Sequence, residues 1–214
     1  WTPTPGMLTI DNVQVQLIDT PPINPDYVEP EFIDLLRRAD LLLIVIDMYG
    51  NVLDQLDQTA DFLARHAIAP LHRHAEIEAD RRIHFVPVLV VANKCNEAAD
   101  DEDYAVLVEL VGDDWPIVPL SAMTGRHVER FKQAIFDQLG IMRIYARPPG
   151  REPDYSKPFV LERGSTVEAF AAAVHHDFVE QLRSARVWGH GVYDGQMVSR
   201  DHVLHDGDLV ELRI

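Results

Sequence analysis

The sequence lacks several features that would place it in a class at once. It has a single cysteine, Cys95, so no disulfide can form within the chain, and this is typical of a protein from a reducing compartment. No apolar run approaches the roughly 20 residues that a membrane-spanning helix needs. No basic segment leads into an apolar core, as it would in a secretory signal. We therefore expect a cytoplasmic protein that does not insert into a membrane.

Positive charge is also scarce. The chain has 19 Lys and Arg against 35 Asp and Glu, a formal net charge of −16. Such a surface repels phosphate backbones, which excludes broad non-specific nucleic-acid binding, and we expect no DNA partner. Residues 157–214 carry six basic against nine acidic side chains, so this part is the less repulsive one. It is the better candidate for any local contact with RNA.

The order of hydrophobic patterns predicts an α/β protein. Continuous apolar runs at 41–47 and 85–93 are typical of parallel strands buried on both faces. A shorter strand is expected at 117–120, and a strand pair at 7–10 and 13–19 around the turn residues Asp11 and Asn12. Helical periodicity is expected in four segments: 28–38, 52–66, 101–111 and 127–139. Strands that alternate with helices indicate a parallel sheet with flanking helices.

Two polar segments have ordinary interpretations. Residues 67–84 are polar and His-rich, and their histidine spacing fits no standard zinc pattern, so we expect a solvated insertion and no metal site. The acidic run 100–103 is expected to be the exposed first turn of a helix, where negative charge is favourable.

A stretch rich in proline, 147–157, predicts a domain boundary. The expected arrangement is an α/β domain over 1–146, a linker over 147–157 and a small α+β domain over 158–214. In the last domain, Gly164-Ser165-Thr166 precedes a helix that starts at Val167, and it offers N-cap chemistry.

Residues 93–96 read NKCN directly after a buried strand, almost as in a loop that recognises guanine. In such a loop the Asn joins loop and base, the Lys stem packs on the purine, and a closing Asp accepts hydrogen bonds from N1 and the exocyclic amine. Here Asn96 replaces that Asp, and its amide offers one acceptor and one donor group. We therefore predict weaker guanine binding and relatively better xanthine binding. The alternative is a plain polar loop after a strand.

Two further motifs lie at compatible positions. LSAMTG, 120–125, follows a short strand and comes about 25 residues after NKCN; its small side chains let backbone N–H groups approach a base oxygen. IDTPP, 18–22, follows a strand, where Asp19 could lie near a Mg²⁺ ion. Pro22 stands where a glycine N–H would reach the γ-phosphate, and proline has no N–H. Taken alone, Asp19 is more often a polar residue at a strand end.

Together these motifs have the order and spacing of a translation-factor-class GTPase. The segments RIYARPPGREPDYSKPFVLERGSTVEAFAAAVHHDF, ARVWGHGVYDG and HVLHDGDLVEL closely resemble the C-terminal end of the Obg/DRG (developmentally regulated GTP-binding) GTPases. That end is a TGS domain, a small β-grasp module. The opening TPTPGMLTIDNVQVQLIDTP is similar to the stretch between the two switches of the same family. The resemblance covers nearly the whole chain.

The resemblance implies a P-loop NTPase-type GTPase (G) domain over 1–146 and a TGS domain over 158–214. It also implies a molecular switch that acts on ribosomes or translation, with a TGS domain that contacts RNA, the ribosome or a regulatory protein. By the same resemblance, Asp19 and Pro22 belong to switch II. The nucleotide-binding residues it implies are Asn93, Lys94, Asn96, Ser121, Ala122 and Met123.

The P-loop pattern G-x-x-x-x-G-K-[ST] does not occur in residues 1–214, and we expect it before Trp1. GTP or GDP with Mg²⁺ is expected for the full-length protein, and none for this chain alone. With no visible general base, hydrolysis would be slow without a partner. Without the P-loop strand, strands 13–19 and 41–47 would lack a shared neighbour and expose their edges. The alternative is a degenerate, non-catalytic G domain that serves as a TGS-bearing adaptor.

Overall fold

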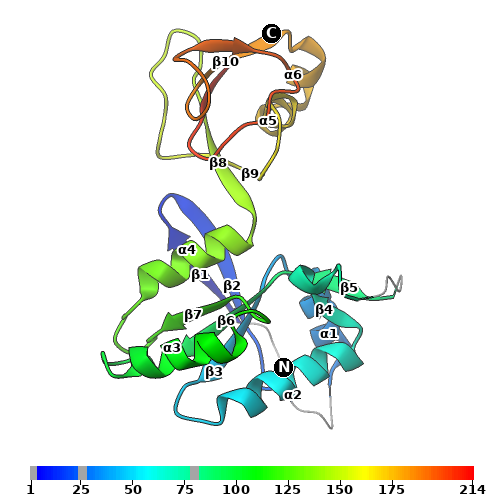
Figure 1. Cartoon of the computed structure of the whole chain (residues 1–214). Helices are drawn as coiled ribbons and strands as arrows, with labels where there is room; N and C mark the ends of the chain where they lie inside the picture. The colour runs from blue at the N-terminus through cyan, green and yellow to red at the C-terminus, as the bar shows by residue number, and fades with distance from the viewer. Residues whose placement is uncertain (1–3, 24–27, 78–81) are drawn as a thin grey trace. The chain divides into compact units, whose positions relative to one another are not determined.

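The chain folds into two compact units, each with its own buried apolar cluster (Figure 1). The computed structural model describes residues 4–23, 28–77 and 82–214. The first unit contains Asp19–Leu139, and the second combines Pro5–Ile18 with Gly140–Ile214. Among the described residues, no helix has both the length and the apolar character needed to cross a membrane.

The first unit is built on a parallel sheet in the order β3-β6-β7, which confirms the predicted α/β class. The strands are β3 (Leu42–Asp47), β6 (Val88–Asn93) and β7 (Ile117–Leu120). The central β6 is the most apolar, and five of its six residues are buried because the sheet is covered on both faces. The register pairs Asp47 with Asn93, and Asn93 with Leu120, so the three strands end in one row.

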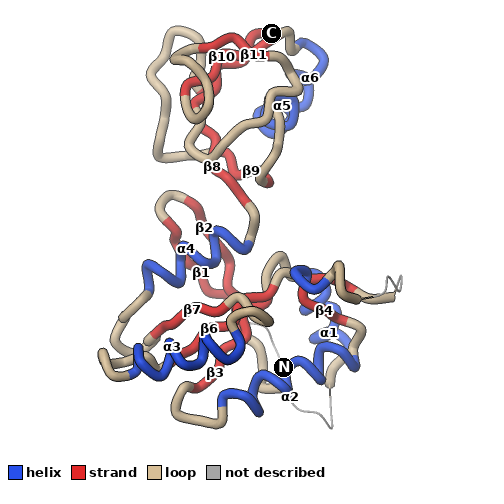
Figure 2. Tube along the Cα trace, viewed as in Figure 1, coloured by secondary structure: helices blue, strands red, loops and turns tan. Residues whose placement is uncertain are grey.

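Within the described residues the first unit has four helices (Figure 2). They are α1 (Pro30–Arg38), α2 (Val52–Arg65), α3 (Asp100–Val111) and α4 (Val128–Gln138). Helix α2 begins where the Asn51 side chain accepts a hydrogen bond from the Asp54 N–H, as an N-cap residue does. On α3, Tyr104, Leu107 and Val111 lie at helical spacing and are buried in the core.

The His-rich segment is better packed than a solvated insertion. It forms β4 (Ile68–Pro70) and a short 3₁₀ turn, η1 (Leu71–Arg73), and β4 pairs in parallel with β5 (His84–Val86). Ile68 is only 2% exposed, and the His74 ring packs against Phe85 at 4.4 Å. The expectation of a solvated insertion was therefore wrong for these residues, because the consecutive residues Ile68, Ala69 and Pro70 of β4 are buried. Residues 78–81 lie outside the described residues.

The predicted hairpin forms from β1 (Thr4–Ile10) and β2 (Val13–Asp19) around Asp11, whose φ is 49°. It makes a separate two-stranded sheet. Within the described residues β3 pairs with β6 alone, and its Val45 is 62% exposed, so the exposed edge expected at 41–47 is present.

The second unit is a five-stranded sheet in the order β11-β10-β12-β8-β9, with two helices. The strands are β8 (Ile141–Ala146), β9 (Phe159–Glu162), β10 (Ser184–Trp188), β11 (Gln196–Val198) and β12 (Leu209–Arg213), and the helices are α5 (Val167–Val174) and α6 (His176–Gln181). Phe170 of α5 is completely buried with strand residues such as Ile144 and Val187. Thr166 caps α5, as predicted, by accepting from the Ala169 N–H.

A buried carboxylate anchors one loop of this unit. Asp208 is 0% exposed, and its two oxygens accept hydrogen bonds from the backbone N–H groups of His190 (3.0 Å) and His205 (2.8 Å). Gly189 lies directly against it: a Cβ at that position would be 1.9 Å from the Asp208 Oδ1. The Asp208 carboxylate thus holds the loop after β10. Only a glycine at position 189 leaves room for this carboxylate.

The predicted boundary at 147–157 differs from the structure. The division falls between Leu139 and Gly140, since β8 pairs with β12 and β9 inside the second sheet. The hairpin also belongs to the second unit. The Asn12 Nδ2 donates to the Tyr145 Oη (2.8 Å), and Arg143 pairs with Asp11 (2.7 Å). The proline-rich stretch is a loop within the second unit, so local composition marked a break in secondary structure and not a break between cores.

Candidate functional site

The candidate site lies at the carboxyl ends of β3, β6 and β7, where the loops that follow each strand meet. This edge of a parallel sheet is the usual place for ligands in open α/β folds. Asn93 ends β6, and its side-chain Oδ1 accepts a hydrogen bond from the Ala122 N–H at 3.1 Å. Ser121 and Ala122 directly follow β7. One side chain therefore joins the two motifs that the sequence predicted to act together.

The backbone of residues 94–96 makes a sharp turn. Lys94 has φ 77°, a left-handed conformation that costs a non-glycine residue about 1–2 kcal/mol. Cys95 is completely buried, and its N–H donates to the Leu120 carbonyl at 3.1 Å. Burial raises the pKa of the Cys95 thiol, which keeps it protonated and makes it an inert core residue. This anchor turns Lys94 and Asn96 outward on either side of it.

Lys94 forms an ion pair with Asp47 at the end of β3, with 2.6 Å between Nζ and Oδ2. Its ammonium also lies 5.8 Å from the ring centre of Tyr49, in range of a cation–π contact. The hydrogen bond from Lys94, with a second from the Tyr49 N–H, holds the pKa of Asp47 below its ordinary value. The lysine stem is therefore held in place before any ligand arrives.

Asn96 lies between two hydroxyl groups. Its Oδ1 accepts from the Ser121 Oγ at 2.7 Å, and its Nδ2 donates to the Tyr49 Oη at 3.3 Å. Ser121 itself is 0% exposed and accepts from the Thr124 N–H at 3.1 Å. Met123 lies in the loop between Ser121 and Thr124, and it is 80% exposed. Residues 121–127 thus form a turn that supports the Asn96 amide from one side.

Arg126 and Asp101 join the same loops from behind, and sequence reasoning did not find them. The Arg126 guanidinium donates to the Glu97 carbonyl (2.6 Å) and to both oxygens of Asp101, and His127 lies 3.0 Å from Asp101. These partners lower the pKa of Asp101 to about 2. Asp101 lies in the acidic run, for which we expected only an exposed helix turn.

Asp100, the first residue of that run, was also misjudged. It is 9% exposed, and it accepts the Glu97 N–H (2.8 Å) while facing the Tyr49 hydroxyl at 3.4 Å. The expectation of exposure fails because the first turn of α3 packs under the 93–96 loop. The sequence shows four consecutive acidic residues at this place. This pattern does not indicate which of the four is buried.

Asp19 and Pro22 are exposed, and within the described residues no hydrogen bond or ion pair joins them to 93–96 or 121–123. Asp19 is the last residue of β2, as predicted. Residues 24–27, which follow in the predicted switch segment, lie outside the described residues.

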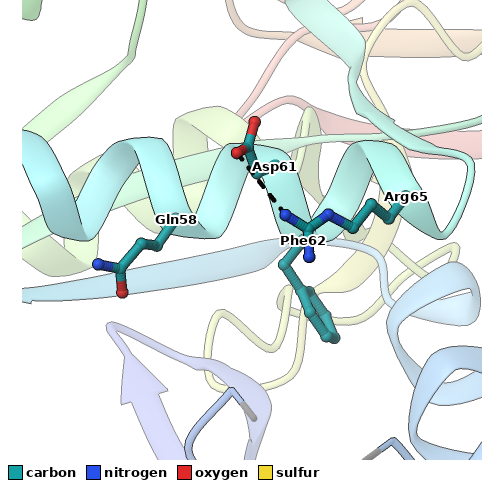
Figure 3. A pocket seen from close by; sticks show the side chains of 4 residues that line it. All are labelled: Gln58, Asp61, Phe62 and Arg65. Carbon is teal, nitrogen blue, oxygen red and sulfur yellow. Dashed lines mark ion pairs between the residues drawn. The ribbon is translucent and has the colours of Figure 1, made fainter. Parts of the chain in front are cut away.

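A separate shallow hollow lies on α2, lined by Gln58, Asp61, Phe62 and Arg65 (Figure 3). Its volume is about 90 Å³. Pockets for nucleotide-sized ligands measure roughly 300–1,000 Å³. The Asp61–Arg65 ion pair at 4.0 Å is exposed and spans one helical turn. We therefore do not regard this hollow as the functional site.

A comparison with known protein families identifies a domain that coincides with most of the second unit. The TGS domain family matches residues 142–214. This span includes all of β8 except Ile141, so it confirms the TGS domain and begins before the predicted linker.

The similar curated proteins are GTP-binding proteins. The chain is 29% identical over 276 residues to "Uncharacterized GTP-binding protein MJ1326" of Methanocaldococcus jannaschii, covering all of this chain and 69% of that protein. It is 31% identical over 130 residues to "Developmentally-regulated GTP-binding protein 1" of Xenopus laevis, covering 60% and 34%. It is 30% identical over 138 residues to "Ribosome-interacting GTPase 1" of Saccharomyces cerevisiae, covering 64% and 36%. The chain thus spans only about a third of the length of the last two.

Solved structures share the fold. A GTP-binding protein from Pyrococcus horikoshii OT3 superposes with a TM-score of 0.64 at 17% identity, covering all of this chain and 88% of that one. The Schizosaccharomyces pombe YchF GTPase gives a TM-score of 0.57 at 10% identity, covering 86% and 75%. At these identities the likeness extends to the fold alone.

Proposed function

We propose that this chain, which carries a TGS domain and is homologous to the DRG-type GTP-binding proteins, is a purine-nucleotide-binding switch of that class. The observation that carries the proposal is the joining of the two base-recognition loops. Asn93 bonds the Ala122 N–H, and Asn96 bonds the Ser121 hydroxyl. In both bonds the donor belongs to 121–122 and the acceptor to 93–96, and two unrelated polar loops would not need to be joined in this way at the ends of neighbouring strands.

Each residue then has a role. Asn93 holds the two loops together, and the Lys94 stem packs on the purine face. Asn96 reads the edge of the base, and the backbone N–H of Met123 approaches a base oxygen, while the Ala122 N–H stays bonded to Asn93. An amide at 96 satisfies one of the two donors of guanine and opposes the other, and an unmet buried donor costs about 1–3 kcal/mol. A 2-oxo purine presents an acceptor there instead, so xanthine is favoured over guanine.

The phosphates would depend on residues beyond those in the two loops. GTP or GDP with Mg²⁺ is proposed for the full-length protein, with Asp19 near the metal through water. Pro22 cannot donate an N–H to a γ-phosphate. This chain alone should bind nucleotide weakly, and hydrolysis would need a partner.

The TGS domain supplies the partner contact in this proposal. One relative is named a ribosome-interacting GTPase, and this supports a contact with the ribosome, its RNA or a regulatory protein in the cytoplasm. The domain is also the less acidic part of the chain, which favours the RNA alternative within it.

A second candidate function is a non-catalytic adaptor, in which a degenerate G domain carries the TGS domain. Pro22 and Asn96 favour it, since both lie inside the chain and both remove a contact that a GTPase uses. Intact mass of the protein from its own cells separates the two: a mass well above 24.3 kDa leaves room for a P-loop, whereas a mass near 24.3 kDa supports the adaptor.

The proposal is tested by equilibrium competition between GDP and XDP on the longest natural chain. We expect XDP to compete better than GDP, and Asn96→Asp to raise the GDP affinity relative to XDP. Gln181→Glu, which adds the same charge on exposed α6, is the matched control. Tight GDP binding with no XDP binding would refute the role of Asn96. No binding of either nucleotide would refute the switch.

A further inference from the structure

A chain of hydrogen bonds with one direction runs through the candidate site. It starts at backbone N–H groups, which can only donate, and ends at a carboxylate, which only accepts. The links are the Arg126 N–H to Thr124 Oγ1 (3.3 Å), Thr124 Oγ1 to Ser121 Oγ (2.8 Å), Ser121 Oγ to Asn96 Oδ1 (2.7 Å), Asn96 Nδ2 to Tyr49 Oη (3.3 Å), and Tyr49 Oη to Asp100 Oδ1 (3.4 Å).

At one end the chain determines where the Ser121 hydrogen points. Ser121 already accepts from the Thr124 N–H and from the Thr124 hydroxyl, at 3.1 and 2.8 Å. Both lone pairs of the Ser121 oxygen are thus occupied. The hydrogen of the hydroxyl group is donated to the Asn96 Oδ1, at 2.7 Å. Because Ser121 is completely buried, water does not offer a competing partner. The side-chain oxygen of Asn96 therefore faces Ser121.

At the other end Asp100 determines where the Tyr49 hydrogen points. The carboxylate is 9% exposed, and both of its oxygens lie 3.4–3.5 Å from the Tyr49 Oη. A hydroxyl beside a carboxylate donates to it, so a lone pair of Tyr49 is left for Asn96. The nitrogen of the Asn96 amide must then face Tyr49. Both ends of the chain demand the same orientation of one amide.

Tyr49 is itself held in position by the turn after β3. Its N–H donates to the Asp47 Oδ1 (2.9 Å), and Gln55 of α2 bonds both the N–H and the carbonyl of Asp47 (2.8 and 3.0 Å). The Tyr49 ring also lies under the Lys94 ammonium. One residue thus contacts both Lys94 and Asn96, the two side chains proposed to hold the base.

We propose that Tyr49, directed by Asp100, is a positioning residue that holds the Asn96 amide in one orientation for a purine whose edge presents one donor and one acceptor. In this orientation one Nδ2 hydrogen and one Oδ1 lone pair remain for the ligand. They match N1–H and a 2-oxo group, which is the edge of a xanthine nucleotide. This inference rests on the proposed nucleotide-binding function.

The same geometry explains why an aspartate does not suit position 96. A carboxylate there has no hydrogen to donate to Tyr49. It would compete with Asp100 for the one Tyr49 hydrogen and add a second negative charge beside a largely buried first one. Asn96 is therefore matched to Tyr49 and Asp100, and its presence is more than the loss of a guanine contact.

The first test needs no nucleotide. In the ligand-free 214-residue chain, we would measure the hydrogen exchange of the Asn96 side-chain NH₂ by NMR, in the wild type and in Tyr49→Phe. We expect exchange to become about tenfold faster in Tyr49→Phe. Tyr193→Phe, which removes the hydroxyl of an 85% exposed tyrosine, should leave it unchanged. Equal exchange in all three proteins would overturn the proposal.

The second test measures XDP and GDP affinities by equilibrium competition on the longest natural chain, as the wild type and with each of the same two substitutions. The wild type and Tyr193→Phe should prefer XDP by about tenfold, and Tyr49→Phe should lose part of that preference because the amide is then oriented by Ser121 alone. A wild-type preference for GDP, or a preference unchanged in Tyr49→Phe, would overturn the proposal. If no protein binds either nucleotide, the proposed function fails, and the exchange measurement decides the role of Tyr49 by itself.

Discussion

Replacing Gly189 by alanine should remove a large part of the stability of the second unit. The new Cβ would lie 1.9 Å from the Oδ1, 2.9 Å from the Cγ and 3.2 Å from the Cα of Asp208. These distances leave no position for the carboxylate, because the Asp208 side chain is completely buried. Asp208 must rotate or be displaced with its backbone.

The magnitude follows from the two hydrogen bonds that would be lost. The N–H groups of His190 and His205 donate to Asp208 at 3.0 and 2.8 Å. Hydrogen bonds to charged groups contribute about 1.5–3 kcal/mol each, so the change should cost about 3–6 kcal/mol. The total free energy of unfolding of a small domain is about 5–15 kcal/mol.

The assay is native-state hydrogen exchange of the amides of β10, which pair with β11 and β12 and so report on the second unit alone. Gly191→Ala is the matched control. Gly191 has φ 74°, and a Cβ added there would meet no atom within 4 Å, so only the left-handed backbone is penalised, by about 1–2 kcal/mol. The reasoning is refuted if Gly189→Ala costs no more than Gly191→Ala.

Three further changes have defined outcomes. The depressed pKa of Asp101 means that its stabilising effect is complete above its ordinary pKa of 3.8 and is lost as pH falls toward about 2. In Arg126→Ala the NMR-measured pKa of Asp101 should rise toward 3.8, and an unchanged pKa would contradict the pairing. Val45→Lys should reduce self-association measured by light scattering, because it places a charge on an exposed edge strand, whereas Val106→Lys on the surface of α3 should not; equal effects would show that the edge is not the cause. Asn12→Ala should lower the free energy of unfolding of the second unit by about 1–3 kcal/mol, since two hydrogen bonds are lost. If urea denaturation detects no change, the contacts of the hairpin turn with Tyr145 and Tyr155 do not stabilise this unit.

Much of the secondary structure could be predicted because its signals are local. The apolar run at 41–47 became β3, and the helical spacing at 52–66 became α2, each within one residue. The motif at 93–96 was placed correctly at a strand end, since a buried strand followed by polar residues marks the carboxyl edge of a parallel sheet.

The domain boundary could not be predicted by the same means. Prolines at 147–157 break regular structure wherever they occur, and they do not show to which core the flanking strand belongs. The pairing of β8 with β12 joins residues more than 60 positions apart in sequence. The docking of Asn12 on Tyr145 spans 133 positions. Neither contact leaves a periodic trace in the sequence.

The candidate site divides in the same way. The sequence by itself determined the types of residue that could meet a purine, because donors and acceptors are properties of side chains: Asn96 carries an amide wherever it lies. Only the tertiary structure decided how that amide is turned. Tyr49 lies 47 positions before it and Ser121 lies 25 positions after it, and the sheet brings both hydroxyl groups to the same side chain. Chemistry is encoded in each residue, whereas direction comes from the neighbours that folding supplies.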